Sequence, residues 1–263
     1  MAHRSEQQVQ VIRGVECRIR RIPAARRLTL TIHYDGTVLV TVPKRVTKNK
    51  VLSFVWSNFS FIEDQLALLE EYRRPLYESP PKVLYQGRWY RVRLVKGNEW
   101  KLRFFATHFV FWHPRTADLA VHLQQHWIDW CRRKAKRILP ELIRSLAQEV
   151  GVQVDRISIR NQRSRWGSCT AARRSISLNW RAILFPTNVL EYLIYHELAH
   201  LRYPHHGRRY WQLVESWMPE YRECERWISA NGPAIMALTT VSKRRHPIQF
   251  ELFAQQSTNR DRS

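Results

Sequence analysis

The sequence predicts an α+β fold, in which a β-rich N-terminal region with one long helix precedes a largely helical region with a small β-sheet. Two patterns indicate this fold. Residues 9–43 and 83–112 are β-like, with apolar and polar residues alternating over 28–32 and a similar period over 38–42, whereas apolar residues recur every three or four positions over 118–150 and 187–203. With 263 residues, 44% of them hydrophobic, the chain is long enough to bury one large core or two small ones.

The N-terminal region, residues 1–116, is predicted to begin with strands. Asp35-Gly36 separates two alternating runs and is typical of a hairpin turn. Residues 47–73 carry apolar side chains at helical spacing and predict one long helix, and the proline-containing residues 74–81 predict a loop. This region contains no recognisable catalytic motif.

The second region, residues 117–232, is predicted to hold the chemistry. It opens with a long amphipathic helix over 118–150, which Pro140 is able to kink or divide. Two short strands are expected next, at 152–159 and 175–180, and residues 161–170 are expected to connect them.

A further helix is predicted to begin with Thr187 as its N-cap and to end before Pro204. Two more helices, at about 208–217 and 219–230, complete this region. Residues 233–263 are basic and polar, and we expect them to form a disordered tail.

The chain is strongly basic, with 44 Lys and Arg against 22 Asp and Glu and a formal net charge of +22. Such a surplus favours contact with polyanions such as nucleic acid or anionic lipid, although general solubility explains it equally well. The local candidate for a polyanion contact is a basic cluster on the helix at 118–150, formed by Arg132, Arg133, Lys134, Lys136 and Arg137.

The cysteines and the hydropathy pattern indicate the cellular compartment in which the protein is located. Four cysteines lie scattered without CxxC spacing, which predicts a reducing environment rather than a disulfide framework. The first residues lack the apolar stretch of a signal peptide, and no apolar run approaches the ~18 residues that span a bilayer. The sequence therefore predicts a cytoplasmic protein without a membrane span.

The motif His196-Glu197-Leu198-Ala199-His200 carries the clearest chemical pattern. Two histidines four positions apart on a helix project from one face, about one turn apart, so both rings can reach one Zn²⁺. Glu197 lies one step round the helix, where a carboxylate can hydrogen-bond a water on the metal and take its proton. The motif predicts a catalytic zinc site with Glu197 as general base.

A third zinc ligand has to come from the turn that follows His200. His206 is favoured, because its spacing from His200 matches that of a long HExxH-containing zinc motif. His205 remains an alternative, and Glu215 would serve if the site used two histidines and a glutamate.

Several segments in order resemble the YgjP-like metallopeptidases, a family distantly similar to the SprT-like proteases. They are RWGSC at 165–169, LNWR at 178–181, HELAHL at 196–201, HHGRRYW at 205–211 and MPEYRECERWI at 218–228. The predicted hairpin at 26–43 is similar to the opening of that family. The resemblance implies a zincin-like metallopeptidase core with His196, His200 and His206 as zinc ligands and Glu197 as catalytic base.

Three further residues are candidates for contacts with the substrate or the transition state. Arg165 could stabilise an oxyanion or a substrate carboxylate, although its RWGSC segment could instead simply pack beneath the zinc helix. Tyr203 and Tyr210 are candidates to donate a hydrogen bond to the tetrahedral intermediate.

These observations lead to one leading hypothesis and two alternatives. The leading hypothesis is a metallopeptidase with one Zn²⁺ per chain, acting on protein or peptide substrates. The basic charge motivates a nucleic-acid-associated, SprT-like protease as the second. The third is a non-catalytic, basic nucleic-acid-binding protein with structural zinc, which four protein ligands rather than three would favour.

Overall fold

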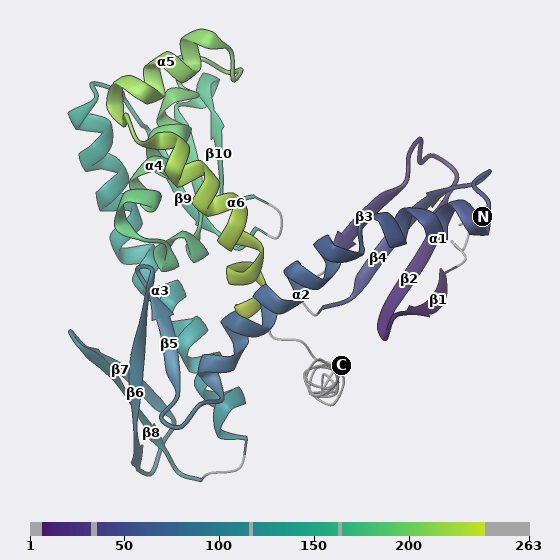
Figure 1. Cartoon of the computed structure of the whole chain (residues 1–263). Helices are drawn as coiled ribbons and strands as arrows, with labels where there is room; N and C mark the ends of the chain where they lie inside the picture. Colours follow the sequence, from purple (N-terminus) through teal and green to yellow (C-terminus); the bar gives the residue numbers. More distant parts are fainter. Residues whose placement is uncertain (1–6, 33–35, 116–117, 163–164, 240–263) are drawn as a thin grey trace, which may run out of the picture. The chain divides into compact units, whose positions relative to one another are not determined.

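The computed structural model of the chain describes residues 7–32, 36–115, 118–162 and 165–239 (Figure 1). It divides into two compact units, one ending at Glu70 and one spanning Glu71–Thr239. The fold is α+β, as predicted. The domain boundary expected after residue 116 falls inside the second unit, because the strands that precede it share one core with the helix that follows it.

The first unit contains a small mixed sheet. Its strands are β1 (Gln7–Ile12), β2 (Val15–Ile22), β3 (Thr29–Ile32) and β4 (Val38–Pro43), in the order β1-β2-β4-β3. Strands β2 and β4 are parallel, and the other two pairs are antiparallel. The alternation in β4 buries Val38, Val40 and Val42 completely. β3 and β4 pair as the predicted hairpin requires, while Asp35 of the predicted turn lies outside the described residues.

The long helix predicted at 47–73 is two consecutive helices, α1 (Lys48–Ser57) and α2 (Phe59–Arg73). The prediction of one helix was wrong because Asn58 ends α1. Its backbone N–H donates to the Val55 carbonyl, and its side-chain amide donates to the Phe54 carbonyl at 2.7 Å. Apolar residues of both helices, Val51, Val55, Phe59 and Ile62, complete the core of this unit.

The second unit begins with the short helix η1 (Arg74–Leu76) and a second mixed sheet. The strands are β5 (Lys82–Tyr85), β6 (Arg88–Lys96), β7 (Lys101–Phe105) and β8 (His108–His113), in the order β5-β6-β8-β7. The helix α3 (Leu119–Glu149) packs against this sheet and runs through Pro140 without a break. Its Trp127 indole donates to the Leu84 carbonyl at 3.0 Å, which joins helix and sheet.

A third sheet lies beyond α3. Its strands β9 (Arg156–Arg160), β10 (Gly167–Thr170) and β11 (Ser175–Asn179) have the order β10-β11-β9, so β10 is an edge strand. The sequence assigned residues 161–170 to a connection and missed β10. Two short 3₁₀ helices, η2 (Ala171–Arg173) and η3 (Trp180–Leu184), flank β11.

Three helices complete the unit: α4 (Thr187–Ala199), α5 (Arg208–Trp217) and α6 (Tyr221–Leu238). Pro186, not Thr187, occupies the N-cap position of α4. The helix α6 continues past residue 232, where the tail was expected to begin, because the side chains from Ala234 to Leu238 are buried in the core and outweigh the proline at 233. Within the described chain, no helix is long and apolar enough to cross a bilayer.

Candidate active site and metal centre

Helix α4 carries the first two histidines of the site. Most of α4 is buried, and His196 and Glu197 lie in its last turn, with His200 at the C-cap. The four-residue spacing places both imidazoles on one face of the helix, with ring centroids 5.0 Å apart. The sequence pattern is therefore realised as one cluster.

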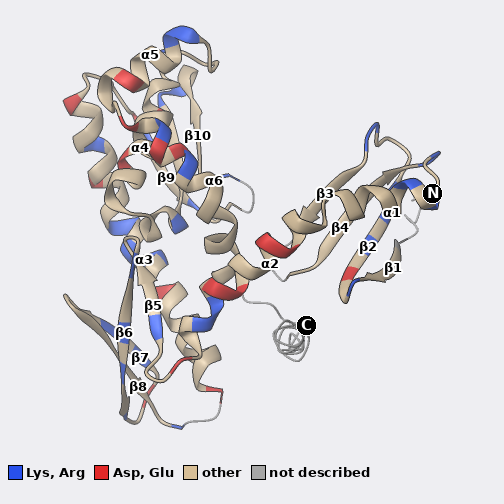
Figure 2. Ribbon diagram, in the orientation of Figure 1, with Lys and Arg blue, Asp and Glu red and all other residues tan. Residues whose placement is uncertain are grey.

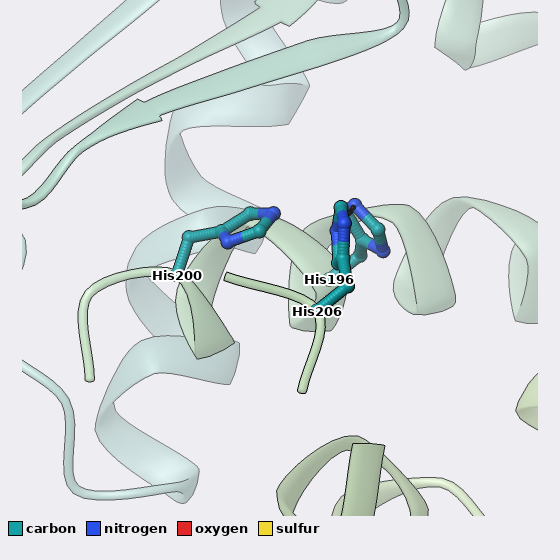
Figure 3. A group of neighbouring side chains, drawn as sticks. All are labelled: His196, His200 and His206. Atoms are coloured by element: carbon teal, nitrogen blue, oxygen red, sulfur yellow. Dashed lines mark hydrogen bonds between the residues drawn. The ribbon is translucent and has the colours of Figure 1, made fainter. Parts of the chain in front are cut away.

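The third histidine, His206, comes from the loop between α4 and α5 (Figure 3). Its Nε2 lies 3.3 Å from Nε2 of His196, and its ring centroid lies 4.6 Å from that of His200. One nitrogen from each histidine can be chosen such that all three lie within 4.8 Å of one another. His205 and Glu215, the alternative ligands, are both exposed and do not belong to this group.

Hydrogen bonds orient two of the imidazoles. Nδ1 of His200 lies 3.2 Å from the Tyr203 carbonyl, and because a carbonyl only accepts, Nδ1 carries the proton and Nε2 is left with a free lone pair. Nδ1 of His196 lies 3.5 Å from the Tyr192 hydroxyl, which can accept its proton, and Nε2 of His196 faces His206. This pattern of an anchored Nδ1 and a bare Nε2 is typical of metal-binding histidines.

Tyr210 forms the wall of the site. Its buried ring contacts all three imidazoles, with centroids 5.6 Å from His196 and 4.7 Å from both His200 and His206. Its hydroxyl donates to the main-chain carbonyl of His196 at 3.0 Å. That hydrogen bond already uses the proton that a transition-state contact would require, which favours a positioning role for Tyr210.

The environment favours the neutral form of His196 and of His200. Burial, and then the neighbouring His200 and His206, lower the pKa of His196 to about 4. The pKa of His200 is also lowered, mainly by burial. Neutral imidazole is the form that donates a lone pair to a metal, so the cluster is ready to bind a cation at neutral pH.

Glu197 is buried against the edge strand β10, with 4% of its surface exposed. A Cβ atom added to Gly167 would lie 2.6 Å from Cδ of Glu197, so any larger residue there would displace the Glu197 carboxylate. Burial raises the pKa of Glu197 to about 8, and its Oε2 has no hydrogen-bond partner among the described residues. A buried carboxylate oxygen without a partner is costly unless a ligand or water completes its surroundings.

The donor set fits zinc. The ligand atoms of three imidazoles lie within 4.8 Å of one another, and Glu197, whose Oε2 has no partner among the described residues, directly follows His196 in the helix. Three protein ligands with an open fourth position are typical of catalytic zinc sites.

The family model described as "YgjP-like, metallopeptidase domain" matches residues 26–231. The chain belongs to the YgjP-like family. Because the matched domain is a metallopeptidase domain, the protein is placed among the peptidase hydrolases.

Two solved structures are similar to part of this YgjP-like chain. One is the metallopeptidase zymogen abylysin of Pyrococcus abyssi, with 22% identity and a TM-score of 0.32, over 35% of this chain and 93% of that one. The other is the metallopeptidase zymogen jannalysin of Methanocaldococcus jannaschii, with 19% identity and a TM-score of 0.33, over 35% of this chain and 95% of that one. No curated protein matches the chain.

Two other residues expected to contact the substrate or transition state, Tyr203 and Arg165, contribute main-chain carbonyls to hydrogen bonds in and around the site of this YgjP-like chain. Tyr203 supplies the carbonyl that orients His200, and the carbonyl of the exposed Arg165 accepts a hydrogen bond from the Asn179 side chain at 3.0 Å. Cys169 on β10 is not a nucleophile here, because burial and the nearby Glu197 raise the pKa of its thiol to about 11.

Sequence reasoning missed two residues that shape the site. Gly167 admits the Glu197 side chain, and the fully buried Asn179 ties down the segment before β10 by donating to the Gln162 and Arg165 carbonyls. Gly167 lies in the RWGSC segment and Asn179 in the LNWR segment, and neither residue was singled out when these segments indicated a resemblance to the family. A glycine at the start of a short strand, as in RWGSC, is the signal that could have indicated a close approach.

Proposed function

We propose that this protein is a zinc-dependent peptidase that holds one Zn²⁺ through His196, His200 and His206. The convergence of the three imidazole nitrogens, together with a buried glutamate that follows His196 in the helix and has an unpartnered oxygen, carries the proposal. Three protein ligands also favour a catalytic over a structural zinc, since a structural site is closed by four.

Zinc bound here would supply a Lewis acid and lower the pKa of a water molecule toward ~7. Glu197 would accept a proton from the attacking water through its free Oε2 and then deliver it to the leaving amine nitrogen. The burial that raises its pKa to about 8 brings its proton affinity close to neutral pH, where it can both accept and donate.

The edge strand β10 offers a place for the substrate backbone. It pairs with β11 on one side and is the outermost described strand of its sheet on the other. An extended peptide could add to this edge through main-chain hydrogen bonds, as in other β-augmentation complexes. Because Gly167 of β10 touches Glu197, a peptide bound there would lie next to the general base.

The cysteines support a reducing compartment such as the cytoplasm as the place of action. All four are free thiols, and Cys17, Cys131 and Cys224 are buried.

The first test is metal content, followed by hydrolysis. We expect about one zinc per chain by elemental analysis after dialysis into metal-free buffer. Glu197→Gln should keep that zinc and lose peptidase activity by at least about a hundredfold, because it removes the general base and leaves the ligands intact. Activity is measured on a denatured protein substrate such as casein.

Two histidine variants provide the control. His206→Ala should lower zinc affinity, whereas His205→Ala, which changes the exposed neighbour outside the cluster, should bind zinc like the wild type. Loss of zinc in His205→Ala with retention in His206→Ala would show that His205, not His206, is the third ligand. Full activity in Glu197→Gln would rule out the proposed base.

A further inference from the structure

The sheet β5-β6-β8-β7 has one face in the core and one face away from it. Val92, Phe109 and Phe111 belong to the core of the second unit. Side chains of opposite parity on β6, β7 and β8 form what we call the outer sheet face, which consists of Arg93, Val95, Lys101, Arg103, Phe105, His108, Val110 and Trp112. None of these residues takes part in the candidate active site.

Aromatic rings occupy the middle and one end of the outer sheet face. Phe105 is 46% exposed, although it is a large apolar side chain. Its ring stacks on His108 with centroids 5.8 Å apart, and it lies 6.4 Å from Trp112. Two hollows of about 460 and 340 Å³ lie on this face, and Trp112 lines both. The rings therefore border open space rather than a packed interior.

Cations accompany these rings. In the strand register, Val110 lies between Arg93 on β6 and Arg103 on β7, so two exposed arginines flank the central strand at about 10 Å from each other. Lys101 lies opposite Trp112 in the same register. Among the described residues that line the two hollows, Glu99 is the single carboxylate, and it pairs with Lys101 at 2.9 Å. Figure 2 shows basic residues along these strands.

We propose that the outer sheet face binds single-stranded nucleic acid. Unpaired bases can stack on Phe105, His108 and Trp112 while the phosphates between them meet Arg93 and Arg103. A duplex hides its base faces, and an acidic peptide would use the arginines but leave Phe105 and the half-buried rings beside it without a stacking partner. The combination of rings and cations on one flat sheet therefore favours an unpaired strand over either alternative.

The test measures binding of the full-length protein to a fluorescein-labelled oligothymidylate of about 16 nucleotides by fluorescence anisotropy. Phe105→Ala should weaken binding about tenfold, because it removes a stacking ring, and Phe105→Tyr should restore it. The matched control is Tyr77→Ala, which removes a 65% exposed aromatic side chain elsewhere in the same unit and should leave binding unchanged.

Charge variants test the phosphate contacts. Arg93→Gln with Arg103→Gln should weaken binding and make the slope of log affinity against log salt shallower by about 1.4. The control is Arg133→Gln with Arg137→Gln, which removes two exposed arginines from the basic cluster of α3. Apart from the effect of the lower net charge, this pair should leave the slope of log affinity against log salt as in the wild type. All four arginines are exposed, so these variants preserve the packed core.

Several outcomes would overturn the proposal: no binding even at low salt, loss of binding in the α3 pair but not in the sheet pair, or indifference to Phe105→Ala. Equal binding of a duplex or of polyglutamate would show a surface that recognises charge alone, which also overturns it. Glu197→Gln should bind the oligonucleotide like the wild type, so this test does not depend on whether the protein is a peptidase.

Discussion

At the scale of single residues, the proposed general base requires a glycine beside it. Glu197 leaves helix α4 and lies directly over the backbone of Gly167, where a methyl group would collide with its carboxylate. The position of the base is thus fixed by β10 as well as by its own helix. Two residues distant in sequence share one functional constraint.

Gly167→Ala should therefore damage catalysis more than folding. The added methyl group would push the flexible end of Glu197 aside, so we expect activity to fall at least about a hundredfold while stability falls by about 1–3 kcal/mol. Activity assays and urea unfolding measure the two effects. Gly207→Ala is the matched control, because no atom lies within 4 Å of the added group and its φ of −80° suits alanine. Equal losses in both variants would contradict the role of Gly167.

The buried carboxylate should make the metal-free protein sensitive to pH. Burial raises the pKa of Glu197 from 4.5 to about 8, so the folded chain binds this proton more tightly than the unfolded chain does. The free energy of unfolding then falls as pH rises from about 4.5 towards 8. Glu197→Gln removes this loss and should be more stable than the wild type at pH 7 by on the order of 3 kcal/mol, with no difference at pH 4.

Urea unfolding of the chelated proteins at the two pH values measures this difference. Equal stabilities at pH 7 would show that the carboxyl group ionises freely in the folded chain.

At the scale of elements, the C-terminus of α4 is fixed by a neighbouring helix. Tyr210 of α5 donates to the His196 carbonyl, one of the last in α4, where helical partners run out. Its ring at the same time supports the three imidazoles. The helix α5 thus holds both the backbone and the side chains of the site.

Tyr210→Phe separates the positioning role from a catalytic one. It keeps the ring and removes the hydroxyl, so we expect the free energy of unfolding to fall by about 1–2 kcal/mol and kcat to change only a few fold. Thermal unfolding and steady-state kinetics on the zinc-loaded protein measure both. A drop in kcat of about a hundredfold or more, without loss of stability, would instead support the transition-state contact expected from the sequence.

The elements that sequence predicts well are those with strong periodicity. Helices α3 and α5 have clear amphipathic spacing, and β6 to β8 are rich in apolar and aromatic residues over enough positions to be recognised as strands. The four residues of β10 are too short and too polar for any alternation, and α6 continues past Pro233 only because tertiary burial compensates. Local patterns carry no information about such long-range compensation.

The same distinction applies to the site. His196, Glu197 and His200 are predicted because their spacing along one helix is itself the signal. The contacts of Gly167 and Asn179 join segments that are distant in sequence, and no pattern within either segment specifies them. The hydroxyl of Tyr210 has a partner that only the packing of α5 on α4 reveals.

At the scale of the whole molecule, the described chain has two separate hydrophobic cores. One includes Val40 and Val55 of the first unit, and the other includes Trp127 and Leu198 of the second. The proposed zinc ligands all belong to the second unit. Metal binding should therefore stabilise one core directly and leave the other unchanged.

Calorimetry of the full-length protein should show this difference as two transitions. Free zinc at about a thousand times its Kd should raise the Tm of the second unit by about 10 °C, and a chelator should reverse the shift. Val55→Ala, at a completely buried position of the first core, should lower only the transition that zinc leaves unchanged. A single transition that responds to both zinc and Val55→Ala would contradict independent cores.

The compact arrangement of the ligands has a consequence for the order in which the molecule matures. His196, His200 and His206 lie on one helix and the loop that follows it, so bringing them together requires little loop closure. The surroundings of Glu197 require the distant strand β10 to have docked. If the proposed function holds, metal capture would precede catalytic competence during folding, and an immature chain that already held its cation would not yet hydrolyse neighbouring chains.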